Sequence, residues 1–452
     1  MKTLLLAALL AAPAHAEISP QVIDRAKNCV VSVERHTLIG LNGESAGRAK
    51  ATGFIVDLAA GIIATNRHVT GTSPARYKVR LRSGNSEAAR LLYYDPFNDF
   101  AFLKVSTAAL AGAAQAAFAG PGALKEGAPV FLVGNNEGYE YSVKTGVIAN
   151  PRVHKGPRQT HTVQTSFDRT GGASGSPVFD AEGRVLGIHS RGSDTSSFEL
   201  PSAYLEDALQ ALRAGRVPRR GDPLLTLSPV PLSEAVKSGR LPGEAAARAK
   251  QAGSGKRALK VETSLRLDLL KPGDILLAAD GTAVGDDSYL FDKLMDARTG
   301  GEAEIEFARN GRLLAARLPV GDANAGKTGR FLSFCGAIFT PFNAGLRLAY
   351  GENSPGVLLD RAEKGSPFYQ PSKKAGGPTL LVQELNGRPV GDLAAFEAAA
   401  GELKDGEDFT FSYTDLSSAG RARREKSAAA DLKFWPTRAY EWSQASLEWI
   451  VK

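Results

Sequence analysis

Three side chains in the first half of the chain could together hydrolyse a peptide bond. His68 follows an apolar run, Asp99 begins another, and Ser174 lies in the glycine-rich turn TGGASGSP. A serine hydroxyl is a weak nucleophile until a histidine takes its proton, and a carboxylate then fixes the histidine tautomer and stabilises the imidazolium. These residue types, in this order, predict a catalytic triad of His68, Asp99 and Ser174.

Each of the three residues also has an ordinary structural interpretation. A lone histidine after a strand is more often structural than catalytic, an aspartate is a common turn residue, and a serine among glycines can belong to a plain loop. The glycines favour the catalytic interpretation. Because Gly172 has no Cβ, its N–H can turn beside the N–H of Ser174 toward a developing oxyanion, at about 3 kcal/mol per donor. We therefore predict an oxyanion hole made by Gly172 and Ser174.

The elements that must position these residues are short strands. Between residues 17 and 213, β-rich runs alternate with Gly, Asn, Asp and Pro, which is typical of an all-β barrel or sandwich, and residues 202–212 read as an amphipathic closing helix. A basic stretch bearing Pro and Gly, residues 214–222, predicts a linker. Two units of similar pattern follow, at 223–321 and 330–440.

Both later units combine a glycine-rich turn, apolar runs and a short helix, which suggests a duplicated module. The first unit predicts a helix over 288–297 and a hairpin of 303–307 with 313–318 around Arg309-Asn310-Gly311. The second unit predicts strands over 380–385 and 408–413, with a helix over 393–403 between them.

Composition places the chain among folded proteins of several domains. It has 452 residues, 43% apolar and 23% charged, which excludes wholesale disorder and a polytopic membrane protein. The 55 Lys and Arg exceed the 48 Asp and Glu, giving a net charge of +7, but they are spread along the chain, so we predict no nucleic-acid partner. No His or Cys cluster has ligand spacing, so we predict no metal and no cofactor.

The N-terminus predicts export. Lys2 precedes an apolar stretch at 4–12, and Ala14-His15-Ala16 has the small-residue pattern of a cleavage site. Residues 1–16 are therefore expected to be a signal peptide, and the mature chain to be periplasmic or secreted. Cys29 and Cys335 are the two cysteines; a disulfide between them is possible in that compartment, but no disulfide framework exists.

Several motifs resemble trypsin-like serine peptidases of the HtrA/Deg kind. TNRHV at 65–69, NDFAFLKV at 98–105 and the glycine-rich serine turn are similar to that family's histidine, aspartate and serine boxes. LKPGDILLAADG at 270–281 resembles its PDZ modules, and 331–345 with 434–437 looks like a divergent second PDZ. The resemblance implies a mostly β fold, in which a chymotrypsin-like double β-barrel precedes two PDZ-like α+β modules, and a homo-oligomer, commonly a trimer.

The pocket that would choose the residue before the scissile bond has three open interpretations. Asp168 lies six residues before Ser174, where trypsin-like enzymes place the acid that binds a basic side chain, and Ser190 and Gly192 are expected in the pocket wall. His189 resembles the histidine with which glutamyl endopeptidases bind an acidic side chain. If Asp168 and His189 instead cancel each other in a structural pair, a small or apolar pocket results.

The resemblance implies a serine endopeptidase that cleaves unfolded or damaged proteins while its PDZ modules hold C-terminal or internal peptides by strand addition. The segment 224–227 is the predicted peptide-binding loop and strand of the first module, and 334–339 that of the second. Two alternatives stay open: a processing endopeptidase of narrow specificity, and a catalytically silent PDZ protein that binds or chaperones peptides.

Overall fold

The structure is a computed structural model that describes residues 18–136, 138–155, 160–168, 171–193, 195–375 and 379–452. The predicted signal peptide lies outside the described residues. In the part of the chain that is described, no helix is long and apolar enough to span a bilayer.

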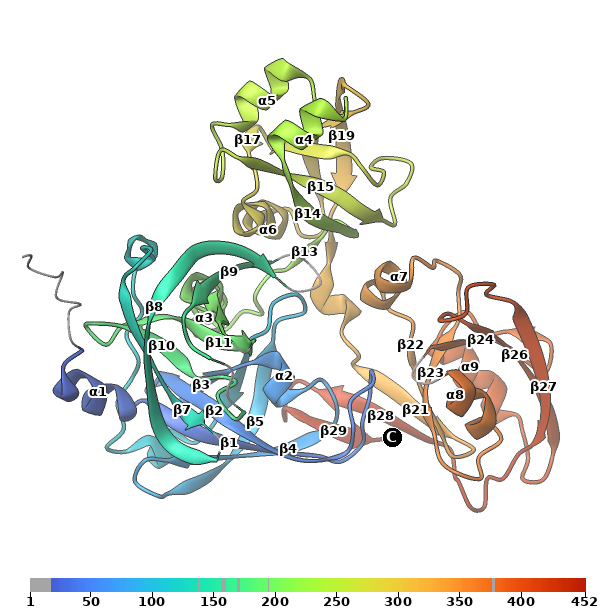
Figure 1. Cartoon of the computed structure of the whole chain (residues 1–452). Helices are drawn as coiled ribbons and strands as arrows, with labels where there is room; N and C mark the ends of the chain where they lie inside the picture. The colour runs from blue at the N-terminus through green and yellow to red at the C-terminus, as the bar shows by residue number, and fades with distance from the viewer. Residues whose placement is uncertain (1–17, 137, 156–159, 169–170, 194, 376–378) are drawn as a thin grey trace, which may run out of the picture.

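The first half forms two closed six-stranded barrels, as predicted (Figure 1). In the first barrel, alternate side chains such as Val33, Ile55 and Leu103 fill the interior, the period-2 pattern of a sheet with one buried face. Helix α1 (Pro20–Lys27) precedes this barrel. Its strands are β1 (Val30–Thr37), β2 (Gly47–Asp57), β3 (Ile62–Thr65), β4 (Ala75–Leu81), β5 (Ser86–Tyr94) and β6 (Ala101–Lys104), in the spatial order β1-β2-β3-β6-β5-β4.

The second barrel shares a core with the first, in which Phe54 and Phe102 join Phe131 and Phe179. The last two rings stack with centroids 4.9 Å apart. Helix α3 (Ser202–Arg213) closes the unit, as predicted for 202–212. The strands are β7 (Pro129–Asn136), β8 (Tyr139–Lys155), β9 (Thr160–Thr165), β10 (Pro177–Asp180), β11 (Val185–Gly192) and β12 (Ser197–Pro201), in the order β10-β11-β12-β9-β8-β7. Two 3-10 turns, η1 (Thr107–Leu110) and η2 (Pro121–Ala123), connect the barrels.

The first PDZ-like unit is a sheet with the predicted helix and hairpin. The helix begins after Asp287, whose side chain accepts the N–H of Leu290, a standard N-cap. The elements are β14 (Leu225–Pro231), α4 (Leu232–Lys237), α5 (Gly243–Ala249), β15 (Arg257–Ser264), β16 (Ile275–Ala279), β17 (Thr282–Ala283), α6 (Ser288–Ala297), β18 (Glu302–Arg309) and β19 (Arg312–Pro319). At the base of the unit, β13 (Gly221–Asp222) pairs with β20 (Gly321–Asp322).

The second PDZ-like unit repeats this plan, with the predicted strands at 380–385 and 408–413 and helix α9 from residue 393 to 401. Its elements are η3 (Ala323–Gly326), β21 (Arg330–Phe334), β22 (Ala337–Pro341), α7 (Ala344–Tyr350), β23 (Val357–Ala362), α8 (Tyr369–Ala375), β24 (Leu380–Leu385), β25 (Arg388–Pro389), α9 (Leu393–Gly401), β26 (Asp408–Asp415), β27 (Arg423–Ala429), β28 (Arg438–Ser443) and β29 (Glu448–Val451).

The two units differ at one sheet edge. The first sheet has the order β14-β15-β16-β18-β19, and the second contains the matching series β22-β23-β24-β26-β27. Among the described residues, strand β14 pairs only with β15, so its outer edge is open. Strand β22, in the matching place, pairs with β21, which pairs in turn with β28, and β29 pairs with the far edge of β28.

The prediction that 334–339 receives a peptide in the second unit is therefore wrong. Cys335 and Gly336 have φ of 44° and 73°, the conformation that a two-residue hairpin turn needs. This turn folds β21 back on β22, and the backbone groups that a peptide would use are already paired. The side chains of Phe334 and Phe339 are buried in the core.

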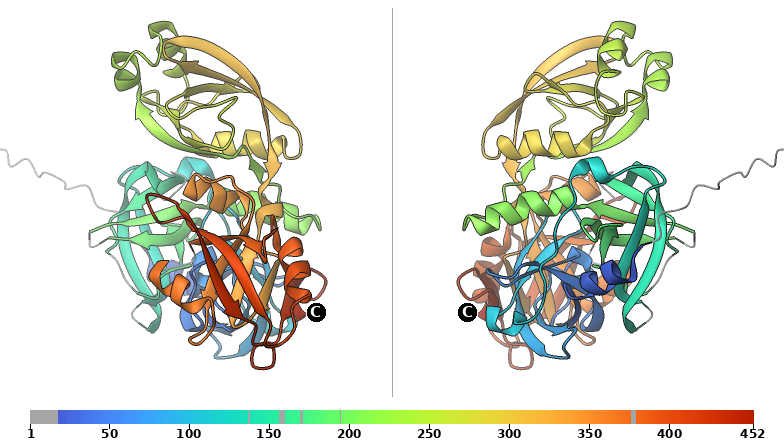
Figure 2. Two further views of the ribbon diagram at one scale, coloured as in Figure 1. Left: turned by 90° about the vertical axis from the view of Figure 1, so that its right-hand side faces the viewer. Right: turned by 90° about the vertical axis from the view of Figure 1, so that its left-hand side faces the viewer.

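Both PDZ-like units contact the barrels (Figures 1 and 2). Helix α6 of the first unit faces the barrel that carries α3, where the rings of Tyr204 and Tyr289 meet edge to face with centroids 4.7 Å apart. The hairpin β28–β29 of the second unit lies against the first barrel, where a guanidinium N–H of Arg90 donates to the carbonyl of Ser446 at 2.7 Å.

The cysteines are not paired: Cys29 and Cys335 are free, buried thiols in the cores of different units. Burial raises the pKa of Cys29 to about 12 and that of Cys335 to about 11. The thiolate is the reactive form, so neither cysteine is suited to redox chemistry in the folded chain.

Candidate active site

The predicted triad residues come from three loops between the barrels. His68 lies in α2 (Arg67–Thr70), the single turn after β3; Asp99 lies between β5 and β6; and Ser174 lies between β9 and β10. His68 Nδ1 is 2.7 Å from Asp99 Oδ2, and the backbone N–H of His68 donates to Asp99 Oδ1 at 3.0 Å. The structure thus joins the predicted base to its predicted orienting acid by two contacts.

A third donor fixes the Asp99 carboxylate. Ser190 Oγ donates to Asp99 Oδ2 at 2.6 Å. Burial alone would raise the pKa of Asp99, but the hydrogen bond and charge of His68 and the hydroxyl of Ser190 outweigh it and hold that pKa at about 2. An ionised Asp99 keeps the histidine proton on Nδ1, which leaves Nε2 free to accept the proton of a nucleophile. Ser190, predicted in the pocket wall, therefore also supports the triad.

The loop bearing Ser174 is fastened to the first barrel. The carbonyl of Ser174 accepts the N–H of Thr52 at 3.0 Å. Gly175 has φ of 83°, and a Cβ there would lie 2.0 Å from the carbonyl oxygen of Thr52, so only glycine fits. Among the described residues Ser174 Oγ donates no hydrogen bond to His68. Such activating bonds are often long without substrate and tighten when it binds.

The predicted oxyanion hole has its donors free. Gly172 has φ of 84°, and its carbonyl is turned toward the Thr52 hydroxyl, which donates to it at 3.1 Å. Within the described part of the chain, the N–H groups of Gly172 and Ser174 donate to no protein acceptor. The two donors are thus left for a negative charge developing beside Ser174.

The predicted pocket residues Asp168 and His189 do not pair with each other. Asp168 has a side chain that is 71% exposed, and its carboxylate lies 2.6 Å from Lys144 Nζ. His189 is buried, and its Nδ1 lies 3.0 Å from Glu199 Oε2. The interpretation in which Asp168 and His189 cancel each other is therefore wrong: Asp168 pairs with Lys144, and His189 contacts Glu199.

Glu199 is a residue that the sequence analysis missed. Its other carboxylate oxygen accepts the hydroxyl proton of Thr165 at 2.7 Å, so the buried carboxylate has two polar partners. Glu199 lies directly opposite His189 in the β11–β12 hairpin, and Gly192 lies opposite Ser197 at its end. Counting back from the turn of this hairpin would have placed Glu199 opposite Ser190, because the register shifts by one residue between His189 and Arg191, and no local signal marks that shift.

A groove with a cavity of about 200 Å³ adjoins Asp99 and was also missed. Three cations reach it, and the ammonium of Lys155 lies 4.6 Å from the centroid of the Phe198 ring. The lining residues are Arg67, Pro96, Phe97, Asp99, Lys155, Thr160, Thr162, Ser190, Arg191, Phe198 and Leu200.

Comparison with known families agrees with this geometry. Residues 51–188, which include all three triad positions, match the family described as a trypsin-like peptidase domain. This part of the chain is a trypsin-like peptidase domain. This match agrees with the predicted serine-peptidase class.

Longer relatives extend the match into the PDZ-like units. The chain is similar to the pro-apoptotic serine protease NMA111 of Eremothecium gossypii, with 30% identity over 416 residues, covering 87% of this chain and 41% of the relative. The protein of that name from Lodderomyces elongisporus is 27% identical over 401 residues, covering 85% of this chain and 40% of the relative. The chain therefore spans about two fifths of the length of these relatives.

A solved structure shares the fold. The HtrA-type protease AlgW with a tripeptide superposes with a TM-score of 0.51 at 22% identity, over 67% of this chain and 96% of that one. The predicted resemblance to HtrA-type proteases is confirmed at the level of the fold. So is the fold class, a double β-barrel followed by further sheets with short helices, consistent with PDZ modules.

Proposed function

We propose that this chain is a serine endopeptidase of HtrA type that acts outside the cytoplasm, in the periplasm or secreted, on unfolded or damaged proteins. The observation that carries the proposal is the carboxylate of Asp99, which is bound at once by His68 and Ser190. A histidine with only a structural role would not need an ionised carboxylate, held by three hydrogen bonds, to orient its ring while the ring itself stays half exposed.

The geometry supports acyl transfer in two steps. Ser174 Oγ attacks the substrate carbonyl while His68 Nε2 takes the hydroxyl proton, and the carbonyl oxygen becomes an oxyanion between the N–H groups of Gly172 and Ser174. The C–N bond then breaks, and His68 returns the proton to the leaving amine. A water molecule, deprotonated by His68, releases the acyl group and restores Ser174.

The open edge of β14 supports peptide binding by the first PDZ-like unit. An extended peptide can add to such an edge by main-chain hydrogen bonds, and the AlgW structure was solved with a tripeptide. We propose that this unit holds C-terminal or internal segments of substrates, and that the chain works as a homo-oligomer, with a trimer as the expected form. The predicted signal at residues 1–16 supports the proposed location outside the cytoplasm.

The charges behind the serine loop favour a small or apolar residue before the cut. Whether His189 is protonated or neutral, the pair that it makes with Glu199 has a net charge of zero or below, which does not attract an acidic side chain. Asp168 is neutralised by Lys144, which weakens its attraction for a basic one.

Digestion of reduced casein tests the proposal. The wild-type chain, Ser174→Ala and the control Ser193→Ala are compared, and every cut is mapped by mass spectrometry. We expect many cuts by the wild type and the control and none by Ser174→Ala. Cuts in one partner protein only would favour the narrow processing enzyme, and no cleavage with peptide binding retained would favour the silent PDZ protein.

A further inference from the structure

The turn that delivers Asp99 is built on a buried carboxylate four residues earlier. Asp95 is completely buried, and its Oδ1 accepts the N–H groups of Phe97 at 2.9 Å and Asn98 at 2.7 Å. The guanidinium of Arg67, the residue before His68, donates to the carbonyls of Asp95 and Pro96 at 3.0 and 2.6 Å. The conformation of this turn therefore sets where Asp99 stands relative to His68.

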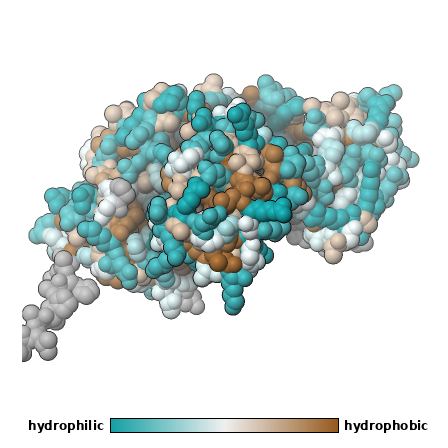
Figure 3. All heavy atoms as spheres, turned by 90° about the horizontal axis from the view of Figure 1, so that it is seen from above, coloured by the Kyte–Doolittle hydropathy of each residue, from teal (hydrophilic) through white to brown (hydrophobic). Residues whose placement is uncertain are grey.

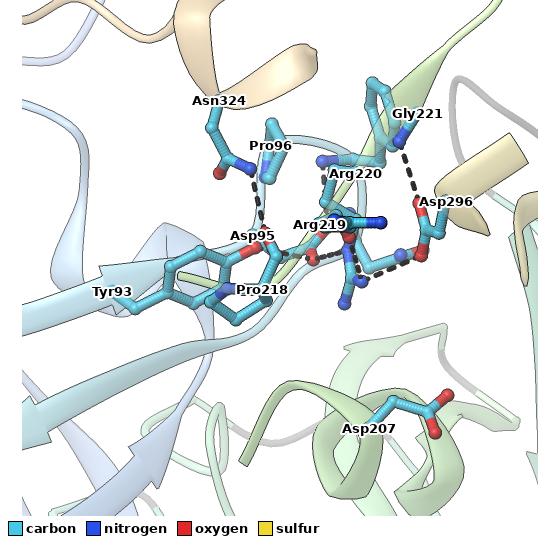
Figure 4. Close-up of polar contacts among 12 residues, drawn as sticks. Tyr93, Asp95, Pro96, Asp207, Pro218, Arg219, Arg220, Gly221, Asp296 and Asn324 are labelled. Atoms are coloured by element: carbon cyan, nitrogen blue, oxygen red, sulfur yellow. Dashed lines mark hydrogen bonds and ion pairs between the residues drawn. The ribbon is translucent and has the colours of Figure 1, made fainter. Parts of the chain in front are cut away.

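The second oxygen of Asp95 is bound from outside the peptidase domain. Arg220 Nε donates to Asp95 Oδ2, which also accepts the hydroxyl proton of Tyr93 at 3.2 Å (Figure 4). Arg220 belongs to the predicted linker, yet its side chain is only 8% exposed. Among the described residues, Arg220 is the one cation in ion-pair contact with Asp95.

The pairing with Arg220 keeps Asp95 ionised. Burial would raise the pKa of this carboxyl, but the charge of Arg220 and the N–H of Asn98 outweigh burial and lower it. Removing one partner of a buried ion pair leaves an uncompensated charge, which is strongly unfavourable. Without Arg220, Asp95 must take up a proton or move toward water, and either change alters the turn that it holds.

Arg220 is itself held by the first PDZ-like unit. Its guanidinium donates to Asp296 Oδ2 at 2.9 Å, and the N–H of Gly221 donates to Asp296 Oδ1 at 2.8 Å, so the end of α6 binds the linker twice (Figure 4). A Cβ on Gly221 would lie 2.0 Å from the carbonyl of Met295, which shows how closely the linker lies on the helix. The carbonyl of Arg220 accepts the N–H of Ala323 at 2.8 Å.

We propose that Arg220 is a positioning residue for the catalytic triad, supplied by the linker rather than by the peptidase domain. It acts through Asp95, which shapes the turn that presents Asp99 to His68. Arg220 touches neither substrate nor the reacting atoms. The inference rests on the proposed function of Ser174, and it adds that the peptidase needs the linker in place to be fully active.

A matched ion pair elsewhere separates positioning from general stability. Arg309 binds Asp274 through two nitrogens at 2.8 and 2.6 Å, inside the first PDZ-like unit and away from the turn. Arg309→Met removes a comparable Arg–Asp pair without touching Asp95. A role of Arg220 that is only structural would make the two methionine variants behave alike.

The test compares Arg220→Met, Arg220→Lys and Arg309→Met in the full chain, using a fluorogenic peptide cut by the wild type. We expect Arg220→Met to lower kcat by about 10- to 100-fold with little change in KM, the usual cost of misplacing a catalytic group. Arg220→Lys should restore part of the loss because it keeps a charge beside Asp95. Arg309→Met should keep the wild-type kcat.

Proton NMR gives a readout that does not depend on turnover. The His68 Nδ1 proton in its bond to Asp99 gives a low-field resonance, which we expect to shift or broaden in Arg220→Met and to stay in Arg309→Met. An unchanged kcat and resonance in folded Arg220→Met would overturn the inference, as would equal losses in both methionine variants.

Two further measurements keep the outcome decisive. If Arg220→Met does not fold, Gly221→Ala displaces the linker from α6 without removing a charge, and an unchanged kcat and resonance there would also overturn the inference. Labelling of Ser174 by a fluorophosphonate is measured in parallel. A wild type that is neither labelled nor active would refute the proposed function, whereas a labelled, active wild type beside an equally active Arg220→Met would refute only the role of Arg220.

Discussion

At the scale of single residues, the proposed triad could be predicted because its chemistry fixes residue types in a short local context. His68, Asp99 and Ser174 each lie beside a strand end or a glycine turn that marks them in the sequence. Their supports were harder to find. Ser190 was predicted in the pocket wall. Its hydrogen bond to Asp99 joins strand β11 to a loop 91 residues earlier in the chain, and no local sequence pattern indicates such a contact.

Ser190→Ala should weaken the triad without abolishing it. The variant removes one hydrogen bond to a charged acceptor, typically worth about 1.5 to 3 kcal/mol, and we expect kcat to fall about tenfold. The lowered pKa of Asp99 stabilises the fold above the unfolded pKa of about 3.9, and this contribution is lost as pH falls through about 2. Ser190→Ala should move that loss to higher pH, which acid unfolding followed by tryptophan fluorescence would show. An identical acid midpoint and kcat would contradict the role of Ser190.

Glu199→Gln should change which bonds are cut. The substitution keeps the shape of Glu199 but removes the negative charge facing His189, so this carboxylate no longer repels an acidic substrate side chain. Mass spectrometry of casein peptides should show cuts after small or apolar residues for the wild type and a larger share after Asp and Glu for the variant. Lys144→Met, which frees Asp168 instead, is the matched comparison and should favour cuts after Lys and Arg. Identical cut sites in all three proteins would show that neither the Glu199–His189 pair nor the Asp168–Lys144 pair determines which residue precedes the cut.

At the scale of elements, helix α6 matched its predicted residues because amphipathic spacing is local information. The covering of β22 was not predictable in this way. Strand β28 joins β21 across more than a hundred residues, and nothing in 334–339 indicates that its edge is already paired. The predicted linker also ends in an ordered strand, β13, because Gly221 packs on α6 and pairs with Asp322.

The difference between the two sheet edges predicts where a peptide binds. Hydrogen exchange with a hydrophobic C-terminal peptide should slow at amides of Leu225–Pro231 in β14 and stay unchanged at Ala337–Pro341 in β22, because β22 is paired on both sides. The peptide with an amidated C-terminus is the control that separates carboxylate recognition from strand addition alone. Slowing at β22 would show that β21 can be displaced.

At the scale of the whole molecule, side-chain contacts join the three units in addition to the polypeptide chain. Figure 3, seen from the side of the first PDZ-like unit, shows apolar atoms gathered among polar ones on the face of the molecule. The exposed large apolar side chains of this unit include Leu267 and Leu313. Charges fix the unit to the barrel, since Asp296 of α6, Arg220 of the linker and Asp95 of the barrel form one cluster in which Arg220 and Asp95 are buried.

This cluster should make the docking of the first PDZ-like unit sensitive to pH through Asp296. Burial raises the pKa of Asp296 to about 6, and the nearby charge of Asp95 adds to this rise. The charge of Arg220 and the N–H of Gly221 lower the pKa, as does Lys293 more weakly, but they do not outweigh burial. Arg220 contacts both acids, and the lowered pKa of Asp95 shows that its charge chiefly stabilises that one. A raised carboxyl pKa means that ionisation costs more in the folded protein than in the unfolded chain.

The stability attributable to Asp296 is therefore fully present below the unfolded pKa of about 3.9 and is lost as pH rises through about 6. A shift of about two pKa units corresponds to about 3 kcal/mol at most. In urea unfolding between pH 4 and 7, Asp296→Asn should show a smaller decline in the free energy of unfolding than the wild type. The control Asp57→Asn should have the opposite effect. Backbone N–H groups and Arg213 lower the pKa of Asp57 despite burial, so removing this carboxylate should lower the free energy of unfolding at neutral pH. Equal pH dependence of the wild type and Asp296→Asn would show that α6 carries no titrating contact with the linker.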